Sequence, residues 1–341
     1  PHGVPLPRPL VGSGEPHFSF AGLKSDVARK AGKFPVADLA ASVQQAVVDC
    51  LVDRPRIALA AAPDGVCFAA SQQGLRISLD AGATWQPAMT EAGDIAVTAL
   101  SLSPRFPEDQ TLFAAIPGAI ARSVDAGETW DFTGVPLPLQ IISQFAISPD
   151  FANDRAIFAA TTDDGMLRSD DGGKSWQAWN FGLLDHNVLS LAISTSDQTL
   201  IAGTTSGLFR SANAGKSWRA IDLDHGFAEI TALATLANGT LFAVLDEESL
   251  YRSTDTGLTW GKIPVPADAI AAIATQSNAI AIAADNAVFT SDDNGTIWER
   301  HGVLEGAISA LTFVNPTTLR GDATTGLIIT ITCTPPQHTQ S

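Results

Sequence analysis

The chain has 341 residues, of which 45% are hydrophobic and 16% are charged, and this is enough apolar sequence for a large core. Its 36 acidic and 20 basic residues give a net charge of −16, which argues against nucleic acid and anionic membranes as partners, because both require a basic surface. No apolar run reaches the length of about 18 residues that a membrane-spanning helix needs.

The first 50 residues differ in composition from the rest of the chain. Residues 1–16 are rich in Pro and Gly, which predicts an extended arm. Polar and apolar side chains alternate in residues 17–20, as in a strand, and residues 36–50 are compatible with a short helix. We therefore divide the chain into an arm (1–50), a main domain (51–333) and a tail (334–341). The three cysteines, Cys50, Cys67 and Cys333, form no CxxC pair, so neither a zinc site nor a disulfide framework is indicated.

An eight-residue motif with the pattern S-x-D-x-G-x-[ST]-W occurs six times between residues 78 and 298 and contains six of the seven tryptophans. Two copies depart from it, with Asn213 at the Asp position and Ile297 at the Ser/Thr position. The Asp or Asn and the Trp of the six copies are Asp80 and Trp85, Asp125 and Trp130, Asp171 and Trp176, Asn213 and Trp218, Asp255 and Trp260, and Asp293 and Trp298.

These residue types predict a hairpin turn between two strands. A short Asp side chain accepts hydrogen bonds from the backbone N–H groups of the residues that follow it, and the amide oxygen of Asn213 can do the same. The Gly supplies a positive φ that other residues reach only at a cost. The Trp buries a large ring where the next strand starts. We therefore expect these Asp, Asn and Trp residues to be structural.

The motif resembles the Asp-box, or BNR repeat, of β-propeller proteins such as sialidases, two-domain xyloglucanases, sortilin-type receptors and photosystem II assembly factors. The resemblance covers about residues 56–332. It implies that each box joins the third and fourth strands of a blade, has a structural role and lies away from the ligand face. It also favours an extracytoplasmic location, although the chain shows no signal peptide and the compartment stays unassigned.

Three apolar runs precede each box, and the spacing of 38 to 46 residues between boxes is typical of a four-stranded propeller blade. After Trp298, three more runs at 310–314, 318–321 and 327–330 lack a box and a fourth strand. Because an open strand edge invites aggregation, we expect residues 17–23 of the arm to supply that strand. The prediction is an all-β, seven-bladed β-propeller of four-stranded antiparallel blades, six with Asp-boxes, closed by the N-terminal segment.

The connections on the face opposite the boxes gather acidic residues and histidines. This face should hold the second-to-third turns and the fourth-to-first connections of all blades. The candidates for a ligand or partner surface are Asp163, Asp164, Trp179, Asp185, His186, Asp222, Asp224, His225, Asp246, Glu247, Glu248, Asp285 and His301. Such residue types also build cation sites and acid–base pairs. Neighbouring blades hold these loops a blade width apart, however, so we expect solvated loop residues, no metal and no cofactor.

The residues present argue against the enzymatic activities of the families that the motif resembles. Sialidases would require a Tyr nucleophile and three arginines at the mouth, whereas Tyr251 is the only Tyr and is predicted inside a strand. Arg122, Arg168, Arg210 and Arg252 each precede a box Ser, which indicates a structural role. A xyloglucanase-like glycosidase would need two carboxylates in a cleft between two propellers. The sequence of this chain predicts a single propeller, so half of such a cleft is absent.

Exposed aromatic residues are expected at Trp179, Phe181 and Phe227. Trp179 is the one Trp outside a box, and it is either a ligand platform or a packed loop anchor. We therefore expect no catalytic residue and predict a non-catalytic interaction or scaffold protein. Its partner would be a protein, expected to be basic, on the face opposite the boxes. The alternative is a carbohydrate-binding or glycoside hydrolase-like propeller with a glycan ligand. Neither nucleic acid binding nor membrane insertion is expected.

Overall fold

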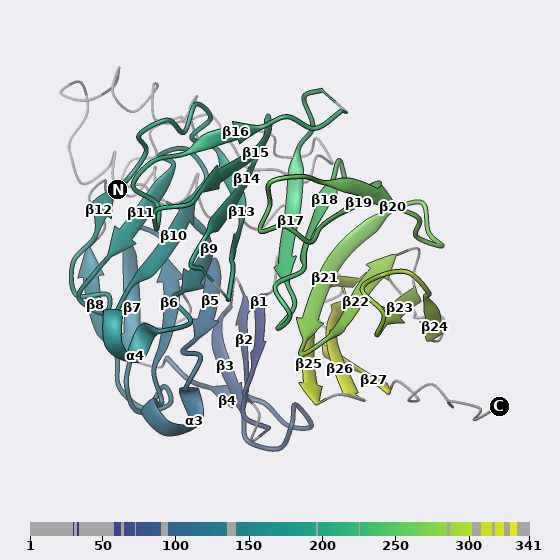
Figure 1. Ribbon diagram of the computed structural model, residues 1–341. Coiled ribbons are helices and arrows are strands. Elements are labelled where there is room, and N and C mark those ends of the chain that lie inside the picture. Colours follow the sequence, from purple (N-terminus) through teal and green to yellow (C-terminus); the bar gives the residue numbers. More distant parts are fainter. Residues whose placement is uncertain are drawn as a thin grey trace.

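A computed structural model gives the fold of the chain (Figure 1). Apart from Lys30 and Lys33, it describes residues 58–332, with gaps at 63–64, 72, 90–94, 135–140, 196, 225, 285–286, 302–307, 316–317 and 324–327. The predicted strand at 17–20, the helix at 36–50, the closing strand at 17–23 and the tail lie outside the described residues. No helix among the described residues is long and apolar enough to cross a membrane.

Six four-stranded antiparallel sheets follow one another along the chain. The first has β1 (Ala58–Ala61), β2 (Cys67–Ser71), β3 (Gly74–Ser78) and β4 (Gln86–Pro87). The second has β5 (Ala99–Leu102), β6 (Leu112–Ile116), β7 (Ala119–Ser123) and β8 (Asp131–Gly134). The third has β9 (Ile142–Ile147), β10 (Ile157–Thr161), β11 (Met166–Ser169) and β12 (Gln177–Ala178).

The fourth has β13 (Val188–Ile193), β14 (Leu200–Thr204), β15 (Gly207–Ser211) and β16 (Arg219–Ile221). The fifth has β17 (Ile230–Thr235), β18 (Leu241–Leu245), β19 (Ser249–Ser253) and β20 (Gly261–Ile263). The sixth has β21 (Ile270–Gln276), β22 (Ala279–Ala284), β23 (Ala287–Ser291) and β24 (Glu299–His301). A three-stranded sheet ends the described chain, with β25 (Ile308–Asn315), β26 (Thr318–Ala323) and β27 (Ile328–Thr332).

The first strands of the sheets form the inner wall of a propeller. Each first strand lies beside the first strand of the next sheet, from β1 through β5, β9, β13, β17 and β21 to β25, and β25 also contacts β1. Side-chain hydroxyls link neighbouring first strands: Thr98 donates to the carbonyl of Ile142 (2.9 Å), Ser143 to Val188 (2.7 Å) and Ser190 to Ile230 (2.9 Å). These bonds satisfy polar side chains in an otherwise apolar wall.

The core lies between neighbouring sheets. Phe113 of the second sheet packs edge-on against Phe151 at the third, with ring centroids 6.0 Å apart, and it also meets Phe145 and Trp176 in one buried cluster. Equivalent clusters join the other sheets, such as the one around Phe158 and Trp218 between the third and fourth. Five of the six box tryptophans, all except Trp85, therefore help to fill interfaces between blades.

The first-to-second turns contain a second repeated motif, which is absent from our predictions. The sequences are Asp109-Gln110-Thr111, Asp154-Arg155-Ala156, Asp197-Gln198-Thr199 and Asn238-Gly239-Thr240. In each, the side-chain oxygen of the first residue accepts the N–H of the third at 2.9 to 3.1 Å, and the middle residue has a positive φ. Two of these turns include one-turn helices, α3 (Phe106–Asp109) and α4 (Phe151–Asp154), where no helix had been predicted.

The all-β fold, the strand order in each blade and the position of each box between third and fourth strands match the predictions for residues 58–301. Because adjacent strands are antiparallel, the boxes and the first-to-second turns lie on one face, which we call the box face. The second-to-third turns and the fourth-to-first connections start at the opposite face.

Candidate interaction surface

The box carboxylates close their own turns. Asp171 accepts the N–H groups of Lys174 and Ser175 through Oδ1, both at 2.9 Å, and the Ser175 hydroxyl through Oδ2 at 2.6 Å. Burial opposes ionisation of Asp171, but the hydrogen bonds from Ser175 and Ser169 outweigh it and lower its pKa to about 2. Asn213 accepts the N–H of Ser217 at 2.9 Å, so its amide takes the place of the carboxylate.

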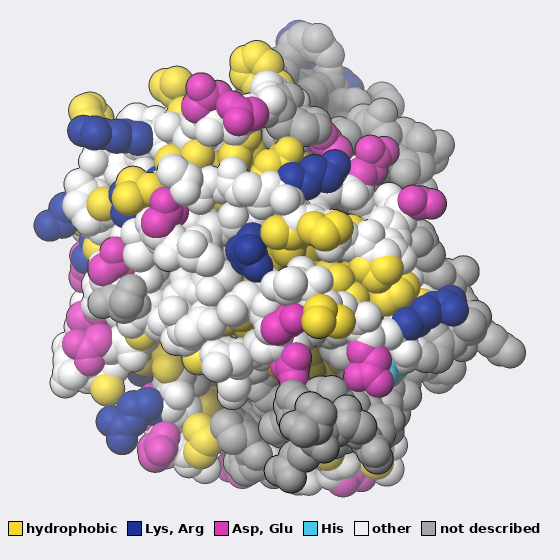
Figure 2. All heavy atoms as spheres, turned by 45° about the vertical axis from the view of Figure 1, so that its right-hand side comes forward, with side chains coloured by type: hydrophobic (Ala, Val, Ile, Leu, Met, Phe, Trp, Pro, Cys, Tyr) yellow, Lys and Arg dark blue, Asp and Glu magenta, His cyan; other side chains and the backbone are white. Residues whose placement is uncertain are grey.

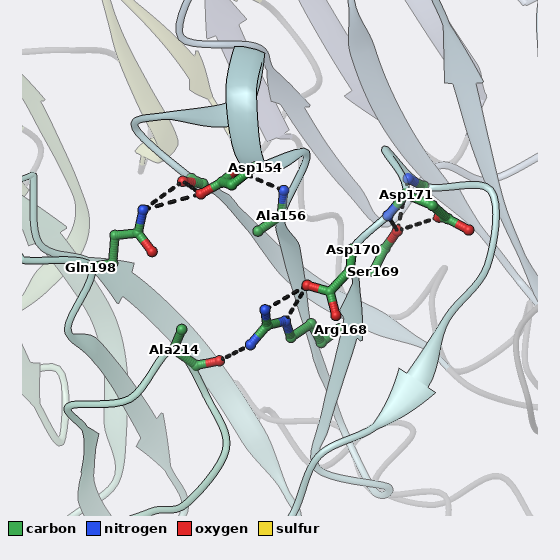
Figure 3. A network of polar contacts seen from close by, with 10 residues as sticks. Asp154, Ala156, Arg168, Ser169, Asp170, Asp171, Gln198 and Ala214 are labelled. Carbon is green, nitrogen blue, oxygen red and sulfur yellow. Dashed lines mark hydrogen bonds and ion pairs between the residues drawn. The ribbon is translucent and has the colours of Figure 1, made fainter.

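Three of the four arginines before the boxes connect neighbouring blades. Arg168 donates to the carbonyl of Ala214 in the next box at 2.6 Å and pairs with Asp170 of the box that follows it in the chain (Figure 3). Arg210 and Arg252 repeat this contact with the carbonyls of Thr256 and Asn294, both at 2.8 Å. Their periodic position therefore reflects a link between successive boxes rather than an anion site.

Replacing Asp171 with alanine should lower the free energy of unfolding by about 1–2 kcal/mol, because the turn N–H groups lose their acceptor. Chemical denaturation of the variant measures this difference. Asp170→Ala is the matched control, since Asp170 is exposed and belongs to the same box but does not close the turn. A variant that kept its stability and lost partner binding would contradict the structural role of Asp171.

On the opposite face, two of the predicted partner residues hold connections together. Asp185 accepts the N–H of Asn187 at 2.9 Å and the hydroxyls of Thr205 and Ser206 at 2.9 and 2.7 Å. Burial opposes ionisation of Asp185, yet these hydrogen bonds lower its pKa. Asp246 accepts the N–H of Glu229 at 2.8 Å. Both carboxylates are thereby engaged within the fold.

The remaining predicted partner residues divide by exposure. Asp163 and Asp164 are half-buried in the β10–β11 turn, and the N–H of Asp164 donates to the Thr161 hydroxyl. His301 lies inside β24, is buried and has its Nε2 2.6 Å from the Thr290 hydroxyl, so it is not part of the exposed face. The sequence predicts His301 in the connection after the fourth strand, but β24 extends to this residue.

His186, Asp222, Asp224 and Glu248 are exposed, and Glu247 is half-exposed. The carboxylates of Asp222, Asp224 and Glu248 make no hydrogen bond or ion pair with another described residue. His225 and Asp285 lie outside the described residues. No three His, Cys, Asp or Glu side chains in the described part of the chain gather as ligands of a metal ion would.

The aromatic candidates differ in exposure. Phe181 and Phe227 are 81% and 91% exposed, as predicted, and Leu184 is 85% exposed. Trp179 is half-buried instead, because the Arg168 guanidinium lies 4.2 Å from its ring centroid and its carbonyl accepts the Trp218 indole N–H. These contacts fit the second of the two alternatives for Trp179, a packed loop anchor, better than a ligand platform.

The segment that leads from β12 to β13 runs along the edge of the fourth blade. The carbonyl of Phe181 accepts the backbone N–H of Trp218 at 2.9 Å, next to the start of β16. Only at Asp185 does the connection reach the β14–β15 turn. In Figure 1 the β16–β17 connection extends beyond the strand ends at the top, and Figure 2 shows hydrophobic and acidic side chains side by side along the upper edge.

Residues 184–311 match a family described as the DUF6242 beta propeller domain. The chain contains a β-propeller domain. Solved propellers extend this likeness over most of the sequence. The GH74 xyloglucanase from Xanthomonas campestris superposes with a TM-score of 0.67 and 16% identity over 81% of this chain and 52% of that chain. YCF48 bound to D1 peptide superposes with a TM-score of 0.63 and 17% identity over 82% of this chain and 94% of that chain.

At these identities the likeness concerns the fold alone. A separate and local similarity links the chain to tRNA N6-adenosine threonylcarbamoyltransferases. The protein from Sphingopyxis alaskensis is 77% identical over 70 residues, which is 20% of this chain and 20% of that protein. The chain thus spans about a fifth of the length of the curated relatives it matches.

Proposed function

We propose that the propeller is a non-catalytic module that binds a protein partner through the side opposite the boxes. The exposure of Leu184 and Phe227, in two neighbouring connections that start at that side, carries this proposal. Phe181 is also exposed and lies in the same connection as Leu184, where it runs beside Trp218 at the edge of the fourth blade. Large apolar side chains exposed together favour a protein contact, and aromatic side chains often anchor interfaces. The peptide-bound YCF48 structure supports it, because that propeller of similar fold holds a peptide.

The acidic residues near these side chains favour a basic partner. Exposed carboxylates that take no part in the fold attract an oppositely charged surface and raise the rate of encounter. The shared fold with a GH74 xyloglucanase supports no glycosidase proposal, since this chain covers about half of that protein at 16% identity. The similarity to tRNA-modifying enzymes covers too little of their length to support a nucleic acid partner.

Neutralising the exposed acids should weaken capture of the partner. We define the rim set as Asp222→Asn, Asp224→Asn and Glu248→Gln, because these side chains are exposed and make no bond within the described fold. Immobilised protein would be used to retain partners from native lysate, with mass spectrometry to quantify them. The yield with the rim set should fall about tenfold relative to the wild type, and less so at high salt, where screening already weakens the attraction.

The matched control changes the same charge on the box face, through Asp131→Asn, Asp292→Asn and Glu128→Gln, which are also exposed. Asp246, Asp109 and Asp154 are unsuitable for either set, since each accepts a hydrogen bond that holds a turn. Equal losses from the two sets would show that acidity acts only on solubility and would contradict a binding face opposite the boxes.

We also propose how the ring of blades closes. The β25–β27 sheet lies between the sixth and first blades and contacts both through β25. The seven-bladed ring that we propose would gain its last fourth strand from residues 17–23. Deleting residues 1–30 should then lower the melting temperature, because β27 would lose its outer neighbour. Thermal unfolding followed by circular dichroism checks this, and an unchanged melting temperature would mean that the arm is an appendage of the propeller.

A further inference from the structure

The outer strand of the fourth blade has an edge that can accept another strand. The order of this sheet is β13–β14–β15–β16, so β16 pairs with β15 on its inner side and with no other strand among the described residues. Such an edge presents backbone N–H and C=O groups with which an extended peptide can pair. The β12–β13 connection covers the first outward position, Trp218, whose N–H donates to the Phe181 carbonyl, so a peptide would pair beyond it.

The register shows which residue of β16 faces outward. In the third blade the N–H of Trp179 donates to the carbonyl of Met166 on the inner side, so the preceding residue, Ala178, turns its backbone groups outward. Ala220 pairs with Phe209 as Ala178 pairs with Leu167. The outward N–H of Trp218, bonded to Phe181, agrees with this assignment, because backbone groups point the same way at every second residue.

Exposed side chains lie at both ends of this edge. Phe181 is held at the start of the strand by its carbonyl bond to Trp218. Phe227 follows the end of the strand, in a connection anchored by the buried residues Leu223 and Ala228. Asp222 and Asp224 lie between β16 and Phe227 and are exposed. An edge flanked by two aromatic residues and two carboxylates fits a peptide with both apolar and basic side chains.

We propose that β16 binds an extended segment of a partner protein by strand addition, with backbone hydrogen bonds to Ala220. Apolar side chains of the segment would contact Phe181 and Phe227, and its Lys or Arg side chains would lie near Asp222 and Asp224. The inference rests on the proposed function, since it specifies how and where the partner is held.

The substitution Ala220→Pro tests the backbone contact directly. Proline removes the outward N–H and leaves the pairing with β15 in place, and it is tolerated on edge strands. The first blade already has proline here, because Pro87 pairs with Arg76 in the register of Ala220 with Phe209. Lys262→Pro is the matched control, since Lys262 pairs with Tyr251 in the same register of the fifth blade.

The probe is a phage-displayed library of random peptides long enough for one strand, selected on the full chain. Enriched peptides would be synthesised with a fluorescent label, and their affinities measured by anisotropy for each variant, with melting temperatures to verify folding. We expect enriched peptides to combine Lys or Arg with apolar residues. We also expect Ala220→Pro and the double variant Phe181→Ser, Phe227→Ser each to weaken binding about tenfold or more, with Lys262→Pro close to the wild type.

Two other results would be informative in different ways. Enriched peptides that bind folded Ala220→Pro as tightly as the wild type would overturn strand addition at β16 and leave the protein-binding function standing. Failure to enrich any peptide above the background of an uncoated surface would overturn both the strand addition and the proposed function.

Discussion

Replacing Trp218 with alanine is expected to lower the free energy of unfolding by about 3–5 kcal/mol, which is the usual cost of removing a buried aromatic side chain. The ring is 3% exposed and belongs to the cluster of Leu183, Met166 and Phe158 between the third and fourth blades. Its indole N–H also donates to the Trp179 carbonyl of the preceding blade at 3.0 Å. The variant would lose both the packing and the hydrogen bond at this junction.

Trp85→Ala provides the matched control, because Trp85 occupies the same box position but is only half-buried and donates to Gly82 of its own box. Urea denaturation of the two variants under identical conditions gives the comparison. The expectation is a clearly larger loss for Trp218→Ala. Equal losses, or a loss below about 1 kcal/mol for Trp218→Ala, would contradict its role between blades.

The boxes made the fold predictable because their side chains act locally. The Asp and the Gly of each copy determine one turn without help from distant residues, and repetition of the motif supplied the blade length. The box arginines could be recognised as structural by their period alone. The carbonyls that they bind, such as that of Ala214, became visible only when the next blade was in place.

The repeated first-to-second turns were not predicted, because the middle residues of three of them do not resemble turn formers. Gln110, Arg155 and Gln198 adopt positive φ values of 48°, 53° and 55°, a conformation usually associated with Gly or Asn. The adjacent side-chain hydrogen bond to the N–H of the third residue compensates for this strain. Aligning the blades on their second strands would have revealed the motif, since the Asp stands at the same distance before each strand.

The partner surface could be predicted only as a set of connections. Asp185, Asp222, Asp224 and Asp246 look alike in sequence, because all are acids in connections between strands. The structure separates them, since the carboxylates of Asp185 and Asp246 accept hydrogen bonds from the fold whereas those of Asp222 and Asp224 accept none from the described residues. Which carboxylates are available for a partner therefore depends on contacts between segments that are distant along the chain.

Acid should destabilise the propeller mainly below pH 4, through the box carboxylates. Hydrogen bonds from Thr84 and Ser78 lower the pKa of Asp80 from 3.8 to about 2. In Asp171 and Asp255 burial acts in the opposite direction, but hydrogen bonds again bring the pKa to about 2. A carboxyl group with a lowered pKa in the folded state stabilises the fold above its unfolded pKa. That contribution is lost as the pH falls through the folded value.

The free energy of unfolding, measured by denaturant titration at a series of pH values, should therefore change little through these groups between neutral pH and pH 4. It should then fall toward pH 2. The double variant Asp171→Asn, Asp255→Asn isolates their share, because Asn213 shows that an amide closes the same turn without titrating. Its curve should be flatter than that of the wild type below pH 4, although Asp125, Asp185 and Asp293, whose pKa values are also lowered, keep some slope. Parallel curves for the two proteins would show that these box carboxylates do not couple folding to pH.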